Sequence, residues 1–67
     1  MRVKSTAGTI AVEVTRQERA NLYAWLAQAE ASAGPGELPA VMWRPSRREW
    51  VIAMPLEDWA KLVRESQ

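Results

Sequence analysis

The spacing of apolar and polar positions changes period several times along this 67-residue chain. Residues 9–14 (TIAVEV) alternate between branched apolar side chains and smaller or polar ones, which is the period-2 pattern of a half-buried β-strand. Residues 2–5 (RVKS) form a shorter run, and Gly8 lies in the stretch between the two. Because glycine tolerates a positive φ, the two runs predict a β-hairpin that turns at or next to Gly8.

A helical period follows the second run. Thr15 and Glu18 have the spacing of a capping box, in which each residue satisfies a backbone N–H of the other, so we expect Thr15 to be the N-cap of a helix. The apolar residues that then recur at helical spacing are Leu22, Trp25, Leu26, Ala29 and Ala33. The breaker sequence Gly34-Pro35-Gly36 predicts where this helix stops.

The remaining residues predict a second hairpin and a second helix. Residues 39–54 read as two strands around a turn at Pro45 to Arg48, where a proline is tolerated. Leu56, Trp59, Leu62 and Val63 then recur at helical spacing. The predicted fold is α+β with the order ββαββα, in which one small mixed or antiparallel sheet and two helices form a single domain over residues 1–67. The order of the strands within the sheet is left open.

Composition excludes several classes of protein. The chain contains neither cysteine nor histidine, which removes disulfides, zinc fingers, thiol catalysis and the Ser-His-Asp triad. Nine basic and eight acidic residues give a net charge of +1, so a basic surface would have to come from clustering. No apolar stretch approaches a membrane span or a signal peptide, and we expect a cytoplasmic protein without a membrane partner.

Three stretches follow one another in an order that a known protein family shares. Two of them are VEVTRQERANLYAWLAQAEASAG and LPAVMWRPSRREWVIAMPLEDWAKLV, and the hairpin before them is a weaker third. Together they resemble phage Holliday-junction resolvase-like nucleases of the PD-(D/E)XK superfamily, in which a strand ending in E-x-K runs into a helix and an Arg-rich hairpin follows. The resemblance spans roughly residues 9–64 and implies a truncated relative built like the C-terminal half of the nuclease core.

The residues that perform catalysis in that family are mostly replaced here. The family holds Mg²⁺ with carboxylates from two adjacent strands and places a lysine near the attacking water. Glu13 matches the family's glutamate, but Thr15 stands at the position of the lysine, and residues 2–5 contain no carboxylate. We expect Glu13 to pair with Arg2 or Lys4, and we assign no catalytic residue beyond Glu13 as a vestigial candidate. No metal and no cofactor are expected, and the interpretation leans away from an enzyme.

Several arginines are candidates for contact with nucleic acid. They are Arg16, Arg19, Arg44, Arg47 and Arg48, and the last three belong to the predicted turn of the second hairpin. Arginine next to aromatic side chains suits phosphate contact and base stacking, and tryptophans flank this turn. The alternative is that arginines in an exposed turn are simply solvated, and Glu49 dilutes their charge.

The aromatic residues suggest an interaction surface. Tyr23 and Trp25 cannot both face a core together with the leucines of their helix unless the buried face is wide. An apolar surface too large for a soluble monomer is most simply covered by a homodimer in which one patch meets itself across a two-fold axis. Alternatively, the final helix covers the sheet through Trp59 and Leu62. The candidate surface residues are Tyr23, Trp25, Trp43 and Trp50.

Two classes of function follow. The first is a non-catalytic, phage-encoded small protein that acts by protein–protein interaction, for example by binding or inhibiting a host factor or another phage protein. The second is a nucleic-acid-binding module derived from a resolvase. A Mg²⁺-dependent nuclease is the least supported, because Glu13 has neither the second carboxylate nor the lysine.

Overall fold

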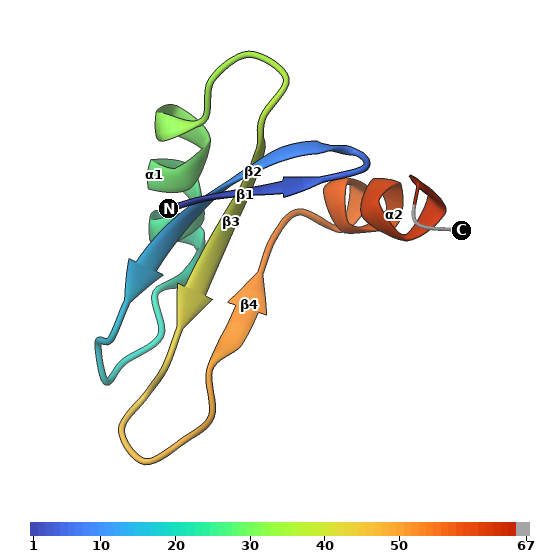
Figure 1. Cartoon of the computed structure of the whole chain (residues 1–67). Helices are drawn as coiled ribbons and strands as arrows, with labels where there is room; N and C mark the ends of the chain where they lie inside the picture. Colours follow the sequence, from blue (N-terminus) through green and yellow to red (C-terminus); the bar gives the residue numbers. More distant parts are fainter. Residues whose placement is uncertain (66–67) are drawn as a thin grey trace.

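The computed structural model describes residues 1–65 and confirms the α+β class and the order ββαββα (Figure 1). A four-stranded sheet has the strand order β1-β2-β3-β4. The strands are β1 (Arg2–Ser5), β2 (Gly8–Thr15), β3 (Leu38–Trp43) and β4 (Val51–Ala53), and the helices are α1 (Leu22–Ser32) and α2 (Leu56–Glu65). The sheet is mixed, because β2 and β3 are parallel whereas the two outer pairs are antiparallel.

The first hairpin forms as its pattern predicts. Strand β1 pairs antiparallel with β2, from Arg2 opposite Ala11 to Ser5 opposite Gly8. Gly8 has a φ of +127°, a conformation that residues with a Cβ avoid, so the glycine is required where β2 begins. The Ser5 hydroxyl donates a hydrogen bond of 2.7 Å to the Gly8 carbonyl, which closes the turn.

Helix α1 begins later than the capping pattern predicts. Thr15 is the last residue of β2, where it pairs with Trp43 and its carbonyl accepts the Arg44 N–H at 3.3 Å. Thr15 is therefore part of the sheet, and the N-cap position of α1 is occupied by Asn21, six residues later, so the predicted capping box is wrong. The helix starts at Leu22, and residues 16–21 form a connecting loop. At the other end the helix stops at Ser32, just before Gly34-Pro35-Gly36, as expected.

Helix α1 covers one face of the sheet and forms the core there. It connects the parallel strands β2 and β3 and lies against both of them (Figure 1). Trp25, Ala29 and Val41 are the centre of this core, with Leu26 and Trp43 packed around them. The rings of Trp25 and Trp43 are tilted by 53°, with their centroids 5.7 Å apart.

The second hairpin is shorter than predicted on its outer arm. Strand β4 comprises only Val51–Ala53, so Trp50 and Met54 lie outside it. The turn before it is a β-turn in which the Arg48 N–H donates to the Pro45 carbonyl at 3.2 Å. Arg47, the third residue of this turn, has a φ of +62°, as a type II turn requires at that position.

Helix α2 lies on the other side of the strands from α1, next to the β1–β2 turn (Figure 1). The Thr6 hydroxyl donates a hydrogen bond of 3.3 Å to the carbonyl of Glu65, which ties that turn to the end of the helix. No residue of α2 is buried, and Leu56 and Trp59 are exposed. Within residues 1–65, neither helix is long and apolar enough to cross a membrane.

Candidate phosphate-binding site

Two segments far apart in the sequence meet around a basic pocket of about 220 Å³. One is the loop between β2 and α1, and the other is the turn between β3 and β4. The residues that line the pocket are Arg16, Glu18, Arg44, Pro45, Ser46 and Arg47. The structure thus brings Arg16 together with Arg44 and Arg47, which the sequence only offered as separate candidates.

Local hydrogen bonds fix the turn side of the pocket. Arg44 directs its Nε to the Arg48 carbonyl at 2.7 Å, which leaves the terminal nitrogens of its guanidinium for other partners. The left-handed backbone at Arg47 and the bond from Arg48 to Pro45 set the shape of the turn. The arginines on this side are therefore carried by an ordered turn, although their side chains reach into solvent.

The loop side of the pocket is tied to the core through Trp43. Its Nε1–H donates a hydrogen bond of 2.7 Å to the carbonyl of Gln17, directly after Arg16. The bond from Arg44 to the Thr15 carbonyl continues the parallel pairing of β2 and β3 to the edge of the loop. Arg16 therefore starts from a backbone held at both neighbouring positions.

The other two candidate arginines lie outside the pocket lining. Arg48 forms an ion pair of 3.7 Å with Glu49, and both side chains are largely exposed. Arg19 lies in the same loop as Arg16 and is exposed. An exposed ion pair such as Arg48–Glu49 contributes little to stability. Arg48 and Arg19 are therefore both accessible to a ligand that approaches the pocket.

Glu13 lies elsewhere, on the face that α1 covers. It pairs with Val41 and lines a separate pocket of about 210 Å³ together with Val14, Thr15, Gln17, Trp25 and Gln28. No residue of β1 lies opposite it, because the pairing runs only to Arg2 opposite Ala11, and the Met1 amino group donates to the Val12 carbonyl. Residues 1–65 contain no group of three or more acidic residues that could hold a metal ion.

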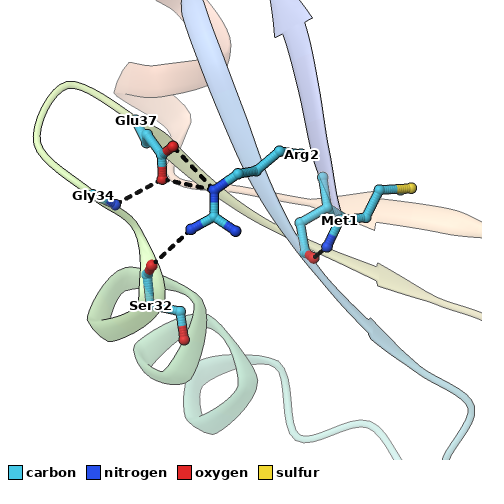
Figure 2. Close-up of polar contacts among 6 residues, drawn as sticks. Met1, Arg2, Ser32, Gly34 and Glu37 are labelled. Atoms are coloured by element: carbon cyan, nitrogen blue, oxygen red, sulfur yellow. Dashed lines mark hydrogen bonds and ion pairs between the residues drawn. The ribbon is translucent and has the colours of Figure 1, made fainter.

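Arg2 pairs with Glu37 and not with Glu13 as we expected (Figure 2). Its Nε lies 3.0 Å from Oε2 of Glu37, and its Nη2 donates to the Ser32 carbonyl at 3.2 Å. The Gly34 N–H donates to the same carboxylate at 2.7 Å. This N–H, and next the Arg2 guanidinium, hold the pKa of Glu37 below its ordinary value. The cluster is a structural clamp between β1 and the turn after α1.

The tryptophans do not all belong to the surface. Trp25 is only 6% exposed and Trp43 is half-buried against it. Both pack in the core and do not belong to the interaction surface predicted from the sequence. Trp43 shares the covered face of β3 with Val41, two residues before it, and Trp25 of α1 packs against both. Tyr23, at 90% exposure, and Trp50 remain on the surface.

Two pocket residues were not singled out from the sequence. The sequence pattern places Glu18 in a capping box and Ser46 in a turn, whereas both line the pocket. A serine within an Arg-rich turn is a usable signal, because its hydroxyl and the guanidinium groups favour the same anionic oxygens. Nothing local in the sequence indicates that the loop after β2 reaches this turn.

No protein-family model matches this chain, and no curated protein or solved structure is significantly similar to it. Function must therefore be inferred from the residues of the chain and their arrangement.

Proposed function

We propose that this chain is a non-catalytic nucleic-acid-binding module that holds backbone phosphates between Arg16, Arg44 and Arg47. The observation that carries the proposal is that three arginines from two separate segments line one pocket. Guanidinium groups bind phosphate oxygens through paired, charge-assisted hydrogen bonds. Phosphate contacts supply most of the affinity of sequence-independent binding to nucleic acid.

The electrostatic surroundings support a phosphate as the ligand. The chain as a whole carries a charge of only +1, so the positive field is local to this region. Within residues 1–65, the ion pairs involve Arg2 and Arg48, and none involves Arg16, Arg44 or Arg47. Glu18 is the one acidic residue in the pocket lining and offsets part of this charge.

The non-catalytic part of the proposal rests on the sequence resemblance and on the surroundings of Glu13. Thr15 replaces the lysine that the resolvase-like family would use, and it also belongs to the Glu13 pocket. On the face of the sheet that carries Glu13, β1 contributes the cations Arg2 and Lys4 and no second carboxylate. We expect junction DNA to stay intact in Mg²⁺ with both the unmodified protein and its Glu13→Ala variant.

Fluorescence anisotropy with a short duplex and with branched DNA tests the phosphate site. Three phosphate contacts predict a slope of about −2.7 when the logarithm of the association constant is plotted against that of the salt concentration, or about 0.9 per contact. Arg47→Asn should reduce the magnitude of this slope by about one unit. Asparagine is a matched replacement because it tolerates the positive φ of Arg47.

The control removes a charge of the same type from another place. Arg64→Gln lies in the last turn of α2, outside the pocket, and should leave the affinity close to that of the unmodified protein. The proposal fails if DNA does not bind at low salt. It also fails if Arg16→Gln and Arg47→Asn weaken binding no more than Arg64→Gln does.

A second candidate function is contact with another protein, in the manner of a phage-encoded factor that binds a host or phage protein. The supporting observation is the exposure of Tyr23 and Trp50, two aromatic side chains of the kind enriched in interfaces. A stoichiometric complex with one purified partner, lost in Tyr23→Ser or Trp50→Ser, together with no DNA binding at low salt, would favour this function over the first.

A further inference from the structure

The two faces of the sheet differ in charge, and the difference is opposite to what an open sheet usually shows. Paired residues share a face and successive residues alternate, so Arg2, Lys4 and Glu13 all lie on the face that α1 covers. The other face, called here the open face, receives no charged residue from any of the four strands. An antiparallel or mixed sheet that meets solvent on one side normally places its polar residues there.

The open face is only partly closed within one chain. Its centre is buried at Val12, Leu38 and Ala40. Beyond this centre, Val14, Met42 and Ile52 pair with one another across β2, β3 and β4 and form an apolar row. Val14 is 49% exposed and Ile52 is 60% exposed, so the row is open to solvent.

Among the described residues 1–65, α2 is the one helix on this side, and it does not close the row. Helix α2 lies next to the β1–β2 turn, as Figure 1 shows, and none of its residues is buried. One hydrogen bond from the rest of the chain to α2 runs from Thr6 to Glu65, at the end of the sheet away from Thr15 and Trp43. Val14 and Met42 of the row directly precede Thr15 and Trp43 in their strands. The row therefore lies toward the end of the sheet that is far from this hydrogen bond.

The total exposed area is larger than that of a typical monomer of this mass. The chain exposes 4952 Å². A folded monomer of 7.6 kDa exposes only about 4300 Å². The excess of about 650 Å² is close to the area of about 800 Å² that each subunit contributes to a standard interface.

We propose that a second copy of this chain covers the open face, with the row of Val14, Met42 and Ile52 meeting its own equivalent across a two-fold axis. In an isologous contact a residue close to the two-fold axis meets its own copy, so a charge at that place would face a like charge. The strands place no charge there, and the excess exposed area of the chain is of the same order as one subunit's share of a standard interface. The inference does not depend on the phosphate site, which different residues form.

Sedimentation velocity over a range of protein concentrations tests the proposal directly. The unmodified protein should sediment as a dimer that dissociates on dilution. Ile52→Lys and Val14→Lys each place two like charges at the interface and should raise the dissociation constant by roughly tenfold or more. Val51→Lys is the matched control, because Val51 is the exposed neighbour of Ile52 on the same strand but lies on the face shared with α1.

Single cysteine variants provide a second measurement that does not rely on a disruptive charge. The chain has no cysteine, so Ile52→Cys introduces the only thiol. A short dimaleimide should link two copies of Ile52→Cys efficiently and two copies of Tyr23→Cys poorly. A monomer at every concentration would overturn the proposal, as would a dimer that tolerates both lysine variants and links through Tyr23→Cys instead.

Discussion

The Nε of Arg2 lies 3.0 Å from Oε2 of Glu37, although the two residues are 35 positions apart in the sequence. The contact joins the edge strand β1 to the turn between α1 and β3. Because Glu37 also accepts the Gly34 N–H and its own N–H donates to the Gly34 carbonyl, this one carboxylate orders the turn and holds the strand.

Glu37 should make stability depend on pH. Its pKa is lower in the folded chain than in the unfolded one, because the Gly34 N–H and then Arg2 favour the carboxylate. The stabilisation is therefore present above the pKa of the unfolded chain and is lost as the pH falls through the lower pKa of the folded chain. Urea unfolding at a series of pH values should show the free energy of unfolding falling in this acidic window.

Glu37→Gln should remove this component. The variant should be less stable than the unmodified protein at neutral pH. The difference should shrink in acid, because the carboxyl of the unmodified protein is then protonated and, like glutamine, uncharged. Glu30→Gln on α1 is the matched control, since Glu30 is exposed and belongs to neither ion pair of the described chain. An acid dependence that Glu37→Gln leaves unchanged would assign the effect to other carboxylates.

Trp25 should be the least replaceable side chain of the core. It is buried against Ala29, Val41 and Trp43, and Trp25→Ala should cost about 3–5 kcal/mol, enough to unfold much of a domain of this size. Trp25→Phe retains an aromatic ring beside Trp43 and should cost less. Tyr23→Ala, two positions away but exposed, should change stability by no more than about 0.5 kcal/mol. Thermal unfolding followed by circular dichroism gives the comparison.

Gly8 should tolerate no side chain. At its φ of +127° an added Cβ would also lie 3.3 Å from the Gly36 carbonyl oxygen, so backbone strain and a close contact act together. We expect Gly8→Ala to cost about 1–3 kcal/mol. Gly36→Ala should cost less, because its φ is +78° and its added Cβ would meet nothing within 4 Å. Equal losses at the two positions would show that the close contact is unimportant.

Trp43 should act as a positioning residue for the phosphate site. Trp43→Phe keeps a ring against Trp25 but loses the Nε1–H bond to Gln17 that restrains the loop of Arg16. The stability loss should be about 1 kcal/mol or less, because the freed carbonyl can bind water. DNA affinity should fall several-fold with the salt slope retained, since no phosphate contact is deleted. Trp50→Phe is the control and should change neither quantity.

The local sequence pattern predicts a strand or helix correctly where the residues carry one periodicity. It is wrong at Thr15, which ends a strand pattern and also fits the start of a helix. The alternation in β2 and the breaker at Gly34-Pro35-Gly36 predict the strand and the end of α1 closely. The capping signal at Thr15 is as good in the sequence, yet the structure uses Thr15 in the sheet, because a strand partner at Trp43 supplies the pairing. A local signal carries no information about such a distant partner.

The sequence by itself determined the element types, their order and the positions of the turns, because side-chain periodicity and the conformations of glycine and proline are properties of neighbouring residues. Tertiary structure alone decided that β2 and β3 run parallel, that Arg16 lines one pocket with Arg44 and Arg47, and that Arg2 meets Glu37. It also decided that the charged strand residues share the covered face. These features depend on strand register, and a register is fixed only when the whole sheet and its helix pack together.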